Sequence, residues 1–83
     1  MKTKEISAFR LIEIGCDAAI LERLLPEDQR LVLEYDDLDQ RWHCTLKFDK
    51  ETVEKSGISL YNFYTDDEGN YYYPLIVEPE DVD

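Results

Sequence analysis

The sequence is poor in the residues that build most catalytic and metal sites, because it holds only one histidine, two cysteines and three glycines. Zinc needs about four converging ligands, and His43 has no second histidine with which to share a metal. The chain shows no glycine-rich phosphate loop, no nucleophile elbow and no usable Ser/His/Asp set. We therefore expect no enzyme activity, no cofactor and no metal ligands.

Long apolar runs are also lacking, since none approaches the roughly 18 residues that a membrane helix needs. No charged-then-apolar leader is recognisable either. The two cysteines, Cys16 and Cys44, stand in apolar surroundings, which is typical of reduced, buried thiols in a cytoplasmic protein. A Cys16–Cys44 disulfide is the alternative, favoured only by the even number of cysteines.

Basic residues are scarce, and their scarcity is uneven along the chain. The net charge is −11, from 20 acidic and nine basic residues. Residues 1–33 hold six acidic and five basic side chains, whereas residues 34–83 hold fourteen and four. After Gly57 there are seven acids and no lysine or arginine. Such a field repels nucleic acid and anionic membranes and attracts basic proteins.

The first third of the chain predicts a strand followed by a helix. Apolar residues alternate within Ile6–Ile14, which favours a strand. Asp17 is a good N-cap residue, and an apolar stripe at helical spacing runs from it to Pro26, so a helix is expected between them. A helix-turn-helix over Ile6–Leu25, turning at Gly15, is the alternative.

The middle of the chain predicts a β-hairpin, because apolar and polar residues alternate in both Leu31–Tyr35 and Arg41–Phe48. Placing both apolar sets, including Trp42, on the core face fixes the register. Four cross-strand pairs follow: Tyr35 with Trp42, Leu33 with Cys44, Asp36 with Arg41, and Glu34 with His43.

A short helix, capped by Asp49 and ended by Gly57, is expected to precede a second hairpin. The strands of this hairpin are Ile58–Thr65 and Asn70–Val77, joined by a four-residue turn. Pro74 cannot donate to a ladder, so its strand is expected at an edge. One face then carries Ile58, Leu60, Tyr64, Tyr71, Tyr73, Leu75 and Val77. The other face carries Tyr61, Phe63, Tyr72 and Ile76.

The elements together predict an α+β fold, a small antiparallel sheet of two hairpins with four or five strands and one main helix packed on one face. A chain of 83 residues forms one domain at most, with a thin core. We expect that domain to span residues 1–77 and residues 78–83 to form an acidic C-terminal tail.

The candidate binding residues are the acids of the two turns and the aromatic residues near the second turn. They are Asp36, Asp37 and Asp39 in the first turn, Asp66, Asp67 and Glu68 in the second, and Tyr61, Phe63 and Tyr72 beside it. Neither turn has the ligand spacing of an EF-hand calcium loop. Exposed carboxylates steer a basic partner, and desolvated aromatic side chains anchor it. If the hairpins point the same way, all six carboxylates share one end of the sheet.

The sequence therefore predicts a small, acidic, non-enzymatic binding protein whose partner is a basic protein. Our first hypothesis is an inhibitor or decoy that occupies the basic nucleic-acid-binding surface of a nuclease or similar complex. Anti-CRISPR proteins and other DNA mimics have this general build, although no motif here identifies a family. The alternatives are an immunity protein or antitoxin that neutralises a basic toxin, and an assembly or scaffold subunit. Direct binding to nucleic acid or to a membrane is not expected.

Overall fold

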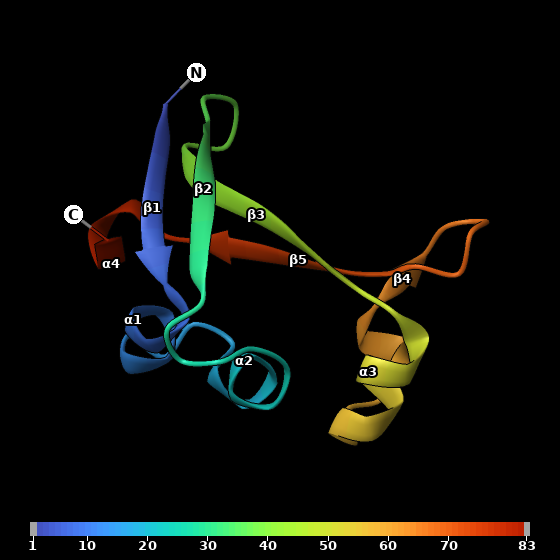
Figure 1. Cartoon of the computed structure of the whole chain (residues 1–83). Coiled ribbons are helices and arrows are strands. Elements are labelled where there is room, and N and C mark those ends of the chain that lie inside the picture. The colour runs from blue at the N-terminus through green and yellow to red at the C-terminus, as the bar shows by residue number, and fades with distance from the viewer. Residues whose placement is uncertain (1, 83) are drawn as a thin grey trace.

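The computed structural model describes residues 2–82, and within them five strands form one antiparallel sheet in the order β1-β2-β3-β5-β4 (Figure 1). The elements are β1 Thr3–Ser7, α1 Ala8–Glu13, α2 Ala18–Leu24, β2 Arg30–Asp36, β3 Arg41–Phe48, α3 Lys50–Ser56, the 3-10 turn η1 Leu60–Asn62, β4 Tyr64–Thr65, β5 Tyr71–Val77 and α4 Pro79–Val82. The predicted α+β class is confirmed. The expected single main helix is not, because α1, α2 and α3 have six or seven residues each.

The strand predicted over Ile6–Ile14 is wrong beyond Ser7, where the chain turns into α1. Ser7 begins this helix as its N-cap, because its Oγ accepts a hydrogen bond from the backbone N–H of Arg10 at 3.1 Å. Ala8 and Leu11, three residues apart on one helical face, are fully buried. For residues 8–24, the helix-turn-helix alternative therefore describes the structure better than the strand prediction does, although a strand precedes the two helices.

The helix predicted after Asp17 is confirmed as α2, but Asp17 does not cap it through its side chain. Asp17 has a φ of 48°, in the left-handed region, and its carboxylate makes no capping hydrogen bond. The carboxylate instead lies beside the Tyr73 hydroxyl. Burial, together with the charge of Asp17 and a hydrogen bond to it, raises the pKa of Tyr73 to about 12.

The first hairpin has the predicted register at its tip, where Glu34, Tyr35 and Asp36 pair with His43, Trp42 and Arg41. The Tyr35 and Trp42 rings meet edge-on at 5.2 Å, as cross-strand aromatic pairs do. The ladder then stops, and β2 and β3 diverge (Figure 1). The expected Leu33–Cys44 pair is therefore not formed within the described residues.

β3 diverges because it follows β5, with which it forms seven pairs from Trp42–Val77 to Phe48–Tyr71. β5 is not an edge strand as predicted from Pro74, because β4 lies outside it. However, β4 pairs only with Tyr71 and Tyr72. β4 therefore does not extend as far as Pro74, and the missing N–H of proline costs no hydrogen bond on that side of β5.

The short helix after β3 is confirmed as α3. Asp49 caps it, with Oδ1 accepting a hydrogen bond from the Thr52 N–H at 2.8 Å. Gly57 ends it at a φ of 78°, which only glycine adopts without strain. Hydrogen bonding by the Asp49 carboxylate to Thr52 lowers its pKa.

The strand predicted over Ile58–Thr65 is wrong except at its last two residues. Ser59 starts the 3-10 turn η1 instead, because its Oγ accepts from the Tyr61 N–H and its carbonyl accepts from the Asn62 side chain. Such local hydrogen bonds compete with a strand ladder. Only Tyr64 and Thr65 pair with β5.

The second turn is also one residue longer than predicted, since Thr65 pairs with Tyr71 and not with Asn70. A shift of one residue moves every side chain of a strand to the opposite face. Tyr64 therefore stacks on Tyr72, at 5.5 Å between ring centroids, and not on the core side with Tyr71. The predicted alternation within β5 itself is confirmed, with Leu75 and Val77 buried and Ile76 exposed.

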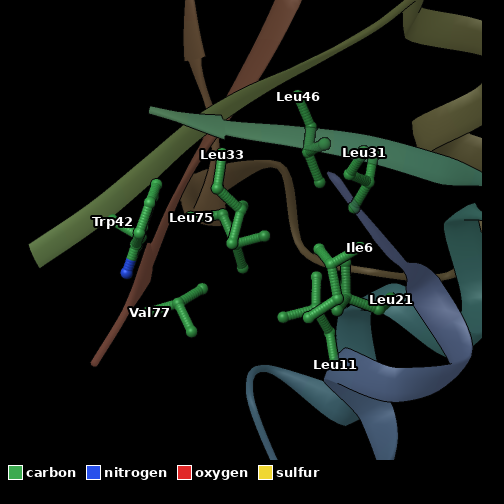
Figure 2. Close-up of a cluster of buried hydrophobic side chains, with 9 residues drawn as sticks. All are labelled: Ile6, Leu11, Leu21, Leu31, Leu33, Trp42, Leu46, Leu75 and Val77. Atoms are coloured by element: carbon green, nitrogen blue, oxygen red, sulfur yellow. The ribbon is translucent and has the colours of Figure 1, made fainter. Parts of the chain in front are cut away.

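The core lies between the sheet and the pair of helices α1 and α2 (Figure 2). Trp42 and Val77 occupy one end of the cluster and Leu11 and Leu21, from the helices, the other. The nine side chains of this cluster are Ile6, Leu11, Leu21, Leu31, Leu33, Trp42, Leu46, Leu75 and Val77. The predicted placement of Trp42 in the core is confirmed, because only 6% of it is exposed.

Part of the predicted C-terminal tail lies against the domain. Pro79–Val82 form α4, and the side chain of Val82 packs on the core. The Lys4 ammonium donates a hydrogen bond to the Val82 carbonyl oxygen. Met1 and Asp83 lie outside the described residues, and the boundary at residue 77 stays a prediction. No helix in residues 2–82 is long and apolar enough to cross a membrane.

We predict that Trp42→Ala lowers the free energy of unfolding by about 3–5 kcal/mol, because it leaves a large cavity in a thin core. Urea unfolding followed by circular dichroism measures the change. Leu38→Ala is the matched control, since Leu38 is 96% exposed and should change stability by less than about 0.5 kcal/mol. Equal stability of both variants would contradict the core position of Trp42.

Candidate functional site

The two acidic turns lie at opposite ends of the β3–β5 ladder, so the six candidate carboxylates do not share one end of the sheet (Figure 1). The β2–β3 turn lies beyond Trp42 and Val77, and the β4–β5 turn lies beyond Phe48 and Tyr71. Six strand residues at roughly 3.3 Å each put about 20 Å between the two ends of the ladder. The predicted site is therefore two separate surfaces.

In the β2–β3 turn, two of the three predicted aspartates hold the turn together. Asp36 Oδ1 accepts from the Leu38 N–H at 2.8 Å, and Asp39 Oδ1 accepts from the Arg41 N–H at 3.0 Å. These are the local hydrogen bonds for which turns use aspartate. Within residues 2–82, the Asp37 carboxylate makes no hydrogen bond or ion pair and is fully available to a partner.

A groove of about 500 Å³ lies beside this turn, and we call it the tip groove. Its walls combine acidic, apolar and aromatic side chains. The lining residues are Glu34, Tyr35, Asp36, Asp37, Leu38 and His43. Leu38 stands at the turn with 96% of its surface exposed, so it contributes almost nothing to the core. An exposed aliphatic side chain among carboxylates suits a contact with a basic side chain, whose stem is apolar and whose head is charged.

His43 does face the solvent side of the sheet opposite Glu34, as predicted, but its closest contact is a different carboxylate. The His43 Nε2 atom lies 2.7 Å from Oδ2 of Asp39 and 3.9 Å from Oδ2 of Asp36. The sequence pattern concealed this contact because it depends on the fold of the turn. The spacing of four residues between Asp39 and His43 was the only signal for it.

In the β4–β5 turn, Asp66 organises the loop. Its Oδ1 accepts from the backbone N–H groups of Glu68 and Asn70, and its Oδ2 accepts from the Asn70 side chain and the Tyr72 hydroxyl. These hydrogen bonds, those of Asn70 above all, hold the pKa of the Asp66 carboxyl far below its usual value. The same bond to Asp66 raises the pKa of Tyr72. Asp67 and Glu68 make no hydrogen bond or ion pair through their side chains in the described part of the chain.

The three predicted aromatic residues do not form one surface. Tyr61 is completely exposed on η1. Phe63 is half-buried, with its ring edge-on to those of Phe48, Tyr71 and Tyr73 at centroid distances of 5.7 to 6.3 Å. Its predicted place on the open face is therefore wrong, because the β4–β5 turn is one residue longer than predicted and the residues before it face the opposite side. Tyr72 lies on the opposite side of β5, stacked on Tyr64.

Cys16 and Cys44 are both free, and each is only half-buried, so the full burial expected of them is not found. Burial, with smaller contributions from Asp17 and Asp81, raises the pKa of Cys16 to about 11. Burial and the charge of Glu34 raise the pKa of Cys44. Both thiols are therefore protonated at neutral pH and are poor nucleophiles.

We predict that the β4–β5 loop loosens in acid because Asp66 must lose its charge. A carboxyl whose pKa is lowered in the folded state stabilises it above the unfolded value of 3.8, and this contribution is lost as the pH falls below that value. The protection of the Glu68 and Asn70 amides, measured as their hydrogen-exchange rate relative to unstructured peptide at the same pH, should therefore fall below about pH 4. Asp66→Ala, which removes the oxygen that accepts from both amides, should lower this protection already at pH 6, whereas the matched Asp67→Ala should not. Identical exchange in the two variants would disprove the role of Asp66.

No protein-family model, no curated protein and no solved structure matches this chain. Its function is therefore inferred from the charges, exposures and distances of its own residues.

Proposed function

We propose that the protein is a non-enzymatic inhibitor or decoy that occupies the basic, nucleic-acid-binding surface of another protein. The observation that carries this proposal is the charge asymmetry, because residues 34–83 hold fourteen acids against four basic residues. A surface that binds phosphates should accept such carboxylates in their place, with a strong dependence on salt.

The acids of the two turns fall into two groups, those that hydrogen-bond within the turn and those that do not, and this supports the proposal. Asp36, Asp39 and Asp66 are engaged in the turns they build. Folding does not require the carboxylates of Asp37, Asp67 and Glu68, which project into solvent at the two ends of the sheet. Because they lie on surfaces about 20 Å apart, they match a partner with an extended basic surface better than one with a single basic pocket.

The tip groove is the contact that we propose to hold the complex together. Exposed charges mainly raise the association rate, whereas a desolvated side chain slows dissociation. Leu38 is the exposed apolar residue within this groove, and an arginine or lysine of the partner would lie between its side chain and the carboxylates of Glu34 and Asp37. Tyr61, fully exposed and remote in sequence, is the second candidate anchor.

We further propose that the protein acts in the cytoplasm, because its two half-buried cysteines are free and suit a reducing compartment. An immunity protein or antitoxin for a basic toxin would present the same surfaces. The two proposals differ in whether the partner's bound surface normally holds nucleic acid, which competition can measure.

The protein itself should not bind nucleic acid. Gel-shift experiments with duplex and single-stranded DNA at physiological salt should show no retained complex, because the field of net charge −11 repels phosphates. Retention of either form of DNA would contradict the proposed function.

Affinity capture from a cell lysate should recover a basic protein that increasing salt, or added duplex DNA, releases from the column. The triple variant Asp37→Asn, Asp67→Asn, Glu68→Gln should associate with this partner more slowly and with a weaker salt dependence, while its melting temperature stays unchanged. Leu38→Ala should instead raise the dissociation rate, and Val32→Ala, an exposed aliphatic residue outside the tip groove, is its matched control. Release by salt but not by DNA would favour a toxin as the partner. Unchanged kinetics in both test variants would disprove the proposed surface.

A further inference from the structure

Two carboxylates and one imidazole converge at the tip of the β2–β3 hairpin. One ligand atom from each of Asp36, Asp39 and His43 lies within 4.8 Å of the other two. The His43 Nε2 atom stands 2.7 Å from Asp39 Oδ2 and 3.9 Å from Asp36 Oδ2. We propose that these three side chains bind a divalent transition metal of the Zn²⁺ type. This inference is independent of the proposed protein partner, and it replaces the expectation from the sequence that His43 lacks fellow ligands.

The donor set fits such a metal. Zinc is bound by imidazole nitrogen and carboxylate oxygen at about 2.0–2.2 Å, so two ligands of a tetrahedral ion stand roughly 3.3 Å apart. The distances from His43 Nε2 to the two carboxylates, 2.7 and 3.9 Å, bracket this value. A bound ion would therefore draw the Asp36 oxygen closer to His43 Nε2 and move the Asp39 oxygen slightly away from it. The nitrogen ligand favours zinc-like ions over Ca²⁺ and Mg²⁺, which prefer oxygen.

The charge around the cluster supports the same conclusion. Within residues 2–82, neither Asp36 nor Asp39 forms an ion pair with a lysine or arginine. Arg41, the paired neighbour of Asp36, directs its Nε to Glu78 at 3.4 Å. Two carboxylates thus share one imidazole, and Glu34 adds a third negative charge to the wall of the tip groove. A divalent cation would offset these charges, for which the described residues provide no lysine or arginine ion pair.

The arrangement also leaves room and lone pairs for an ion. Each aspartate uses Oδ1 for a backbone N–H. Asp39 Oδ2 is also hydrogen-bonded to His43 Nε2, and a metal ion bound to both atoms would take the place of that hydrogen bond. The tip groove, which Asp36 and His43 both line, has a volume of about 500 Å³. It can admit the water molecules that complete the coordination of an ion held by three protein ligands.

The cysteines must be excluded as the source of any zinc binding, because thiolates are strong zinc ligands. The test therefore uses the tag-free protein carrying Cys16→Ser and Cys44→Ser. Isothermal titration with Zn²⁺ should show one ion per chain, reversed by a chelator, and NMR should show shifts of the His43 ring signals. In this background, His43→Ala and Asp39→Asn should each weaken Zn²⁺ binding by at least about tenfold. Asp67→Asn, which removes a carboxylate from the other turn, is the matched control and should leave binding unchanged.

The variants suit this test because they should fold. His43 is about one-third exposed, and the Asn side chain in Asp39→Asn keeps an oxygen for the Arg41 N–H. Circular dichroism checks both, with His43→Gln as a substitute for His43→Ala. Absence of binding up to millimolar Zn²⁺ would overturn the proposal, as would binding that survives loss of His43. Equal affinity for Ca²⁺ and Zn²⁺, or binding that disappears with the cysteines, would overturn it as well. None of these results depends on whether a basic protein partner exists.

Discussion

The ladder between β3 and β5 joins seven residue pairs, more than any other two strands in residues 2–82. It ties the C-terminal third of the chain to its middle and decides which side chains face the helices. Trp42, Leu46, Leu75 and Val77 enter the core because this register places them on one face. The same ladder draws β3 away from β2 and sends the two acidic turns in opposite directions.

Aspartate serves this molecule in two distinct ways. In Asp36, Asp39 and Asp66, one carboxylate oxygen replaces a missing backbone partner and so shapes a turn. In Asp37 and Asp67, the same group remains in solvent and contributes only its field. The net charge counts both kinds equally, but their removal has different consequences, since only the first kind also changes the backbone. The acidic surface therefore has two parts: aspartates whose carboxylates shape the turns, and aspartates that the folded backbone does not use.

The sequence predicts those parts of the fold in which local pattern and tertiary contact agree. Alternation gave the faces of β2, β3 and β5 and the buried position of Trp42, because these strands are each buried on one side. It failed at Ala8–Glu13, because apolar residues alternate there as in a strand, whereas the buried positions Ala8 and Leu11 stand three residues apart, on one face of a helix. It failed again at Leu60–Asn62, where hydrogen bonds made by Ser59 prevail over strand propensity.

The candidate site was harder to predict, because it depends on loop geometry. A single extra residue in the β4–β5 turn moved Phe63 into an aromatic cluster and brought Tyr64 out beside Tyr72. The contact of His43 with Asp39 could not be read from strand alternation, which pairs His43 with Glu34. The role of Asp66 was equally hidden, since sequence shows only that acids occupy the turn and not which of them is engaged.

The divergence of β2 and β3 has a consequence for self-association. Beyond His43, no strand in the described part of the chain pairs with β3 on the side that faces β2. An open strand edge is a template on which a second copy of a chain can add by backbone hydrogen bonds, which leads to aggregation. Lys47 on β3 and Arg30 on β2 place charges along this opening, and basic side chains at an edge are a known protection against such pairing. The general repulsion between copies of net charge −11 acts in the same direction, because it opposes the approach of one open edge to another.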